Sequence, residues 1–154
     1  LKRGLRKGVK EADRQQMIER LKILDLGLED RLTTDVAYLS GGQRQALTLL
    51  MATLRKPQVL LLDEHTAALD PKTSEMVLRL TDRIVSEQKL TALMITHNMN
   101  DAVKYGNRLI MLHQGRIILD VSGEEKKNLT IDRLMELFRQ ESGETLASDA
   151  MLLS

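Results

Sequence analysis

Two short stretches of this sequence hold residues whose types and spacing could do chemistry. In the first, Ser40 can cap a helix and Gln43, three positions on, can complete a capping box. Gly41 and Gly42 lie between them and carry no side chains, so an anionic group could reach the first N–H groups of the helix. The helix dipole also favours negative charge at that point. The stretch therefore predicts an anion-binding helix N-terminus.

The second stretch is the apolar run Val59–Leu62, which ends on the acids Asp63 and Glu64. A strand that is apolar on both faces fits the centre of a parallel sheet, and open α/β sheets bind ligands at the carboxyl ends of their strands. Two adjacent carboxylates at such an end, close in sequence to a site for anions, indicate phosphate together with a divalent metal ion.

The order of these residues resembles that of the ABC-type ATPases. Leu39–Gln43 reads LSGGQ and is similar to the family's signature, and Leu60–Asp63 followed by Glu64 looks like its Walker B strand and catalytic glutamate. Ala67–Asp70 resembles the D-loop, and His97 resembles the switch histidine. Each motif alone is weak evidence, whereas four in the family's order and spacing are strong evidence. The resemblance extends from about residue 11 to about residue 121.

The resemblance implies a role for each of these residues, with ATP and Mg²⁺ as cofactors. Asp63 would hold the magnesium ion, Glu64 would orient or polarise the attacking water, and His97 would contact the γ-phosphate. The residues that would bind phosphate and face an ATP held by an opposite protomer are Ser40, Gly41, Gly42 and Gln43. Asp70 would be the D-loop aspartate and is also expected to contribute to nucleotide binding. The composite site therefore needs a dimer.

A plainer structural account exists for each of these residues. The two acids could be solvated groups at a strand exit, and His97 could be a satisfied core histidine. The glycine pair could be a relaxed helix start, and Asp70 a simple N-cap. The signature lies about 20 residues before the acids, and the histidine falls at the end of the next strand. This combination favours the functional account.

The elements that must position the acids and the histidine are predicted from caps and apolar spacing. Asp70 and Pro71 begin a helix that runs to about residue 88, between apolar strands at 59–63 and 92–96. A right-handed crossover of this kind places Asp63, Glu64 and His97 at one edge of one sheet.

The other elements follow from the same signals. Helices are predicted at 11–26, with Gly27 at the C′ position, and at 41–54, where the helix should be buried nearly all round. The second half of the sequence predicts a helix at 99–105, hairpin strands at 108–113 and 116–121, a charged loop at 123–127 and a helix begun by Thr130. We expect an α/β fold, specifically a partial P-loop NTPase fold of the ABC type with a parallel sheet and flanking helices.

The resemblance also implies a division of the chain. Residues 1–38 would end the family's helical subdomain, 39–140 would hold the signature helix with the Walker B and histidine part of the RecA-like core, and 141–154 would form a tail. The family's Gly-x-x-x-x-Gly-Lys-Ser/Thr loop does not occur in the 154 residues, nor do its adenine-stacking aromatic and Q-loop. Because Leu1 is not methionine, we expect the C-terminal portion of a longer subunit. Because the phosphate-binding loop is absent, we expect this portion to be inactive as an ATPase by itself. His65 stands where the family usually has proline, and Thr53 where arginine is common.

Composition narrows the functional classes to which the protein could belong. A net charge of +1 argues against a general nucleic-acid binder, and the lack of cysteine excludes disulfides and thiolate metal sites. No apolar run reaches the ~18–20 residues of a membrane helix, so any membrane link would go through a partner. Residues 1–10 are basic and are expected to be a solvated linker, the tail is expected to be poorly ordered, and His113 is expected at the surface.

Three functions compete at this point. The first is the ATPase subunit of a membrane transporter, most similar to bacterial uptake systems for small organic solutes. It would work with a second nucleotide-binding subunit and permease subunits at the cytoplasmic face of the membrane. The second is the C-terminal lobe of a DNA-repair or chromosome-maintenance ATPase, which should follow a long coiled coil, whereas residues 11–26 supply one short helix. The third is a non-catalytic binding module.

Overall fold

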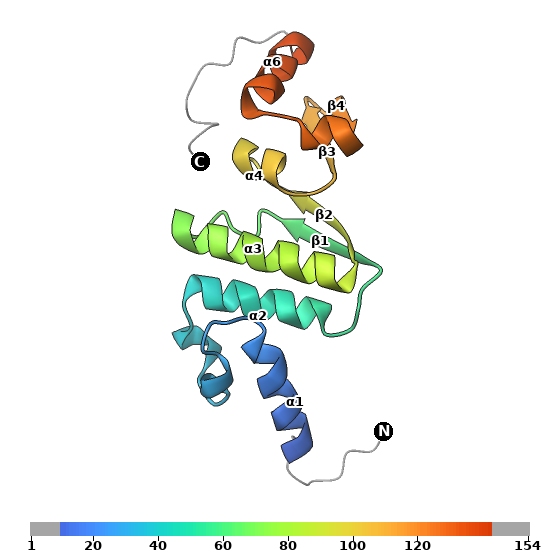
Figure 1. Cartoon of the computed structure of the whole chain (residues 1–154). Coiled ribbons are helices and arrows are strands. Elements are labelled where there is room, and N and C mark those ends of the chain that lie inside the picture. Colours follow the sequence, from blue (N-terminus) through green and yellow to red (C-terminus); the bar gives the residue numbers. More distant parts are fainter. Residues whose placement is uncertain (1–9, 143–154) are drawn as a thin grey trace. The chain divides into compact units, whose positions relative to one another are not determined.

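The computed structural model describes residues 10–142, so the expectations for the basic stretch 1–9 and for the tail 143–154 lie outside the described residues. The chain divides into two compact units, residues 1–93 and 94–154, and each is described by itself. Figure 1 shows the elements in chain order.

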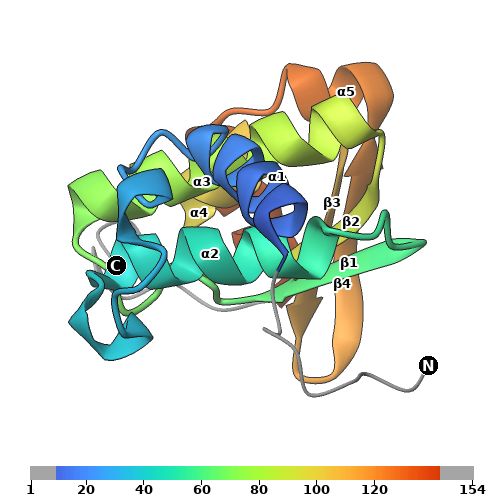
Figure 2. The ribbon, with the colours of Figure 1, turned by 90° about the horizontal axis from the view of Figure 1, so that it is seen from below.

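The first unit is mainly helical. Its elements are α1 (Glu11–Lys22), the 3₁₀ turns η1 (Glu29–Arg31) and η2 (Val36–Tyr38), α2 (Gly41–Thr53), β1 (Val59–Asp63), α3 (Pro71–Gln88) and the start of β2 (Thr91–Ile95). α2 packs along α3, and α1 packs against α2 (Figures 1 and 2). The side chains buried along these helices include Leu21, Ala46, Leu49, Leu50, Val77, Leu80 and Ile84.

α3 has the bounds that its sequence predicts. Asp70 caps it, because the Thr73 N–H donates to Asp70 Oδ1 at 3.1 Å, and Pro71 occupies the first helical position. The helix ends before Lys89, which adopts a left-handed backbone with φ +51°. The residues that begin and end this helix lie at its own termini, which explains why the sequence alone locates it.

α1 is shorter than predicted, ending at Lys22 instead of at about residue 26. The carbonyl of Ile23, which a longer helix would bond to the N–H of Gly27, accepts a hydrogen bond from the Arg83 guanidinium of α3 instead. Gly27 still has a positive φ of 65°, but in the loop and not as the residue that ends the helix. The end of α1 is thus bonded to a residue 60 positions away in the sequence, and the backbone leaves the helical region at Asp25, which has a positive φ of 55°.

β1 and β2 are hydrogen-bonded neighbours that run parallel and are joined through α3, which confirms the predicted strand–helix–strand unit (Figure 1). The expected burial of both faces of β1 is wrong. Leu60 and Leu62 are buried, but Val59 and Leu61 are 53% and 70% exposed, because the described elements of this unit cover only one face. α2 was likewise expected to be buried nearly all round, yet Met51 on its outer side is exposed.

The second unit is built around a hairpin. Its elements are the end of β2, α4 (Met99–Lys104), β3 (Arg108–His113), β4 (Arg116–Ser122), α5 (Gly123–Lys127) and α6 (Ile131–Ser142). β3 and β4 pair antiparallel, with Gln114 and Gly115 at φ +47° and +75° in the turn, as the sequence predicts. Leu109, Val121, Leu129 and Leu134 form its core. Thr130 caps α6 as expected, since its Oγ1 accepts from the Arg133 N–H at 3.2 Å.

Two expectations for this unit are wrong. The charged stretch 123–127 is a short helix and not a loop, anchored by Lys126, which is buried and whose Nζ donates to the Val103 carbonyl. His113 is half-buried and not a plain surface residue, because its ring packs edge-on against Phe138 at a centroid distance of 5.4 Å. Both predictions failed because a tertiary contact decides the structure there, and the sequence pattern around each residue does not reveal that contact.

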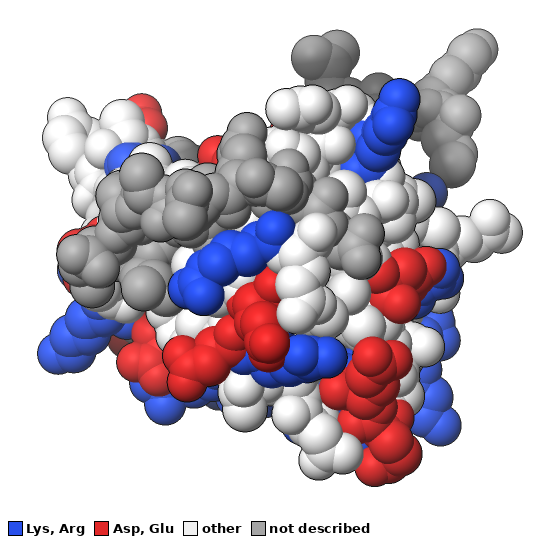
Figure 3. All heavy atoms as spheres, turned by 90° about the horizontal axis from the view of Figure 1, so that it is seen from above, with Lys and Arg blue, Asp and Glu red and all other residues white. Residues whose placement is uncertain are grey.

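Among residues 10–142, none of the helices is both long and apolar enough to cross a bilayer. On the face drawn in Figure 3, lysine and arginine side chains lie interspersed with aspartate and glutamate.

Candidate functional site

The capping box predicted at the start of α2 is present. Ser40 Oγ accepts the Gln43 N–H at 3.2 Å, and the Ser40 N–H donates to Gln43 Oε1 at 3.0 Å. Gln43 also donates through Nε2 to the Leu26 carbonyl at 3.1 Å, so its amide ties the loop after α1 to the start of α2. This network fixes the first turn of the helix, where N–H groups have no intrahelical partner and can face an anion.

The two signature glycines also have a packing role. A Cβ on Gly42 would lie 2.4 Å from Thr73 Cγ2, and one on Gly41 would lie 2.9 Å from Leu69 Cδ2. The start of α2 therefore approaches the first turn of α3 and the loop before it more closely than any larger residue allows. The structure thus brings the signature and the D-loop segment, two of the sequence-predicted motifs, into contact.

Asp63 and Glu64 lie where the sequence places them, at the carboxyl end of β1, and both side chains are exposed. Glu64 has a positive φ of 42°, an uncommon backbone for a residue with a side chain. Its carbonyl accepts the Ala67 N–H at 3.0 Å, and the Thr66 carbonyl accepts the Leu69 N–H at 3.1 Å. The chain therefore leaves the strand through consecutive tight turns, and the positive φ was not visible in the sequence.

The loop after β1 is anchored to α3 at two points. At its end, Asp70 caps the helix, and hydrogen bonds from Thr73 hold the pKa of its carboxyl below the ordinary value. Near its start, the half-buried His65 places Nε2 3.2 Å from Thr81 Oγ1, and burial lowers the pKa of its imidazole. Sequence reasoning noted His65 only as a departure from the family pattern. No local signal connects it to Thr81.

His97 belongs to the second unit, in the segment between β2 and α4. Asn98 next to it caps α4, accepting the Asp101 N–H at 3.1 Å through Oδ1, and the Asn98 N–H donates to Thr96 Oγ1 at 3.1 Å. Burial raises the pKa of Asp101, against the opposing positive charges of Lys104 and His97. These bonds fix the backbone that follows His97, and the partnership of His97 with Glu64 stays a prediction.

The donor set at the end of β1 is compatible with magnesium. Mg²⁺ takes one or two carboxylates and completes its octahedron with water and substrate phosphates. The exposed Asp63 carboxylate can serve as one such ligand. Within residues 10–142 no group of three or more His, Cys, Asp or Glu side chains could form an all-protein metal cage, an arrangement that this ion does not need.

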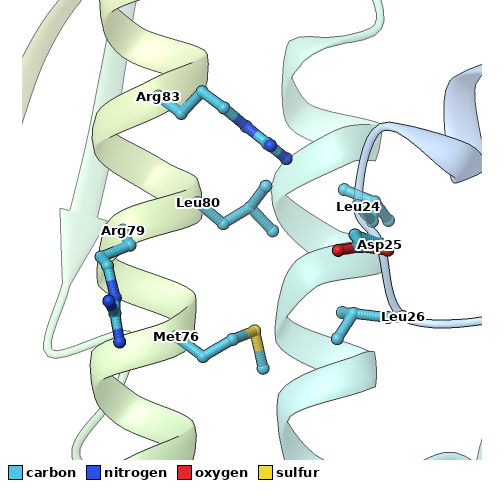
Figure 4. Close-up of a pocket in the computed structure, with 7 residues that line it drawn as sticks. All are labelled: Leu24, Asp25, Leu26, Met76, Arg79, Leu80 and Arg83. Carbon is cyan, nitrogen blue, oxygen red and sulfur yellow. The ribbon is translucent and has the colours of Figure 1, made fainter.

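The first unit also contains a shallow cavity of about 290 Å³ between α3 and the loop after α1 (Figure 4). Its lining residues are Leu24, Asp25, Leu26, Met76, Arg79, Leu80 and Arg83. Four of the lining residues are apolar and three are charged. Both arginines already have partners: Arg83 donates to the Ile23 carbonyl, and Arg79 pairs with Glu75 at 3.4 Å. None of the sequence-predicted site residues lines it.

Comparison with known proteins finds relatives of one kind. The sequence model of the family described as "ABC transporter" matches residues 3–67, a segment that contains both the signature and the acids after β1. A tyrosine transport ATP-binding protein of Clostridioides difficile is 57% identical over 118 residues, covering 77% of this chain and 47% of the relative. Over these matched residues the chain resembles the ABC transporter ATP-binding proteins.

Other ABC proteins show the same resemblance. An aliphatic sulfonates import ATP-binding protein of Burkholderia cenocepacia is 39% identical over 76% of this chain and 35% of its own length. A thiamine import ATP-binding protein of Yersinia pestis is 38% identical over 76% of this chain and 50% of its own length. A solved metal-chelate type ABC transporter in an inward-facing conformation superimposes with a TM-score of 0.66 and 29% identity, over 88% of this chain and 52% of that one. The chain thus spans about half the length, or less, of the ABC proteins that it matches.

Proposed function

We propose that this chain forms part of the ATP-hydrolysing subunit of an ABC importer for a small organic solute. The observation that carries the proposal is the 57% identity to a protein named for tyrosine transport. The match to the family includes both the anion-facing helix start and the carboxylate-bearing strand. An amino acid or a similarly small solute is the substrate class that this likeness favours.

Each site residue has a proposed task in this function. Asp63 holds Mg²⁺, which when bound offsets negative charge on the nucleotide phosphates. Glu64 accepts the proton of the attacking water or orients that water, and His97 hydrogen-bonds the γ-phosphate. The positive end of α2, from Ser40 to Gln43, faces the phosphates of ATP held by an opposite subunit.

The partners follow from the same proposal. A second nucleotide-binding subunit completes each site, and the contact of Gly41 with Leu69 allows the signature and the loop ending at Asp70 to face it together. Permease subunits supply the membrane path, and the subunit lies on the cytoplasmic face of the membrane. The relatives are named for transport and import, which favours this function over a DNA-repair lobe.

The central test is Glu64→Gln in the full-length protein. The substitution keeps the size and hydrogen-bonding capacity of the side chain but removes the carboxylate that activates water. We expect turnover to fall about 10²–10⁴-fold while ATP binding persists. Phosphate release measures turnover, and isothermal titration with ATP measures binding.

Glu87→Gln is the matched control, because Glu87 is an exposed glutamate near the end of α3. This variant should leave turnover and ATP binding unchanged. Turnover of Glu64→Gln within about twofold of the parent would show that a different group acts as the base and would contradict the proposed role.

A further inference from the structure

Glu64 carries its carboxylate on a backbone that needs external support. Its φ of 42° lies in the left-handed region, which non-glycine residues occupy at a cost and retain where the surrounding structure holds them. On one side the support is the turn in which the Ala67 N–H donates to the Glu64 carbonyl at 3.0 Å. A second support must hold the residue that follows.

That second support is the contact between His65 and Thr81. His65 Nε2 lies 3.2 Å from Thr81 Oγ1, and Thr81 is only 5% exposed in the middle of α3. The Thr81 hydroxyl already donates its single hydrogen to the Val77 carbonyl at 2.9 Å. Its oxygen is therefore left to accept, so the hydrogen between the two side chains belongs to His65 Nε2.

We propose that His65 is a positioning residue for Glu64, holding the start of the loop after β1 on α3 through its Nε2–H bond to Thr81. The inference rests on the proposed function, in which Glu64 acts as the base. His65 touches neither nucleotide nor water in this role. It fixes the peptide that joins it to Glu64 and thereby the direction of the neighbouring carboxylate.

Loss of this bond should reduce turnover and spare binding. A general base acts only within hydrogen-bond reach of its water, and a displacement of about 1 Å can cost as much as about 10²-fold in rate. The groups proposed to hold the nucleotide, Asp63 and the start of α2, do not depend on the His65 side chain. The KM for ATP should therefore stay near the parent value.

The experiment measures steady-state phosphate release by the full-length protein with Mg²⁺-ATP. We expect His65→Ala and Thr81→Val each to lower kcat by about tenfold or more, with KM within about twofold of the parent. His65→Gln places an amide N–H at a similar reach and should restore most of kcat. The double variant His65→Ala/Thr81→Val should be no slower than either single variant, because both remove one and the same bond.

Thr53→Val is the matched control. Thr53 is 3% exposed in α2 and makes the same helix back bond, to the Leu49 carbonyl at 2.8 Å, with a second bond to the Leu50 carbonyl. It should lower the thermal midpoint as Thr81→Val does and leave kcat unchanged. If Thr81→Val and Thr53→Val lower kcat equally, or if His65→Gln is as slow as His65→Ala, the positioning role is wrong.

Glu64→Gln in the same assay separates the two proposals. If the parent turns over ATP and depends on Glu64, but His65→Ala matches the parent, only the positioning role fails. If turnover does not depend on Glu64, the proposed function of that residue fails, and the inference about His65 fails with it.

Discussion

Gly42 shows how a single residue can meet two demands at once. It is buried in the first turn of α2, the turn proposed to face an anion, and its missing side chain admits Thr73 of α3 to within 2.4 Å of where a Cβ would lie. The first demand concerns a ligand and the second concerns packing. A substitution at this position therefore changes stability even where no nucleotide is present.

We expect Gly42→Ala to destabilise the protein, although alanine is the better helix former. Propensity favours alanine by about 1 kcal/mol, whereas overpacking against Thr73 costs about 1–3 kcal/mol, so the net loss should reach about 2 kcal/mol. Gly41→Ala is the comparison, because its new Cβ would meet the movable end of Leu69 at 2.9 Å. Thermal unfolding of the full-length protein measures the stability of both variants. A Gly42→Ala variant as stable as Gly41→Ala would contradict the packing role.

At the scale of elements, the hairpin of β3 and β4 is held by a charged pair across its strands. Arg108 Nε and Nη2 donate to the two carboxylate oxygens of Asp120 at 2.7 and 2.5 Å. Hydrogen bonding to Arg108 lowers the pKa of Asp120, and the same pair raises the pKa of Arg108. Both side chains are exposed, so salt screens the pair and its contribution is small.

The lowered pKa of Asp120 gives this contribution a definite pH dependence. The folded hairpin prefers the ionised carboxyl, so the stabilisation is complete above the ordinary aspartate pKa of 3.8 and is lost as the pH falls through the lower folded value. We expect Asp120→Asn to speed amide hydrogen exchange in β3 and β4 at neutral pH and low salt, and to match the parent in strong acid. Asp82→Asn on α3 controls for the loss of one charge. An effect that persists unchanged in acid would contradict the ion-pair account.

At the scale of the whole molecule, the chain holds one part of the proposed nucleotide site and a sheet that the described residues cover on one face only. Val59, Leu61 and Leu93 remain more than half exposed, so one apolar face of the first unit's strands has no cover among the described residues. The acids after β1 are present, but the 154 residues contain no Gly-x-x-x-x-Gly-Lys-Ser/Thr loop to hold the β- and γ-phosphates.

A polypeptide of residues 1–154 alone should therefore release no phosphate from Mg²⁺-ATP above background. Phosphoryl transfer depends on positioning, and Asp63 and Glu64 would have no bound nucleotide on which to act. The measurement is steady-state phosphate release, with Asp63→Ala as the control for contaminating ATPase. Activity that survives purification and disappears in Asp63→Ala would reveal a phosphate site within these residues. The uncovered face also leads us to expect self-association, measurable by sedimentation.

Much of this structure could be predicted because its signals are local. The cap of Asp70 on Thr73, the capping box of Ser40 with Gln43 and the turn at Gln114 each involve residues at most three positions apart. Caps and turns of this kind depend on residue types and spacing that can be read directly from the sequence. The same locality placed the acids at the end of β1, so the candidate site residues and their elements were available from the sequence. The roles of those residues in catalysis remain predictions.

Tertiary contacts decided the rest, because residues far apart in the chain leave no periodic pattern. The Ile23 carbonyl at the end of α1 bonds to Arg83 of α3, and Lys126 anchors a short helix in a stretch that the sequence predicts as a charged loop. The burial of β1 depended on how many layers cover it and not on its own apolar run. The proposed role of His65 depends on its hydrogen bond to Thr81, 16 residues away in the sequence. That bond can form only after α3 has folded back beside the strand, so the sequence around His65 does not predict it.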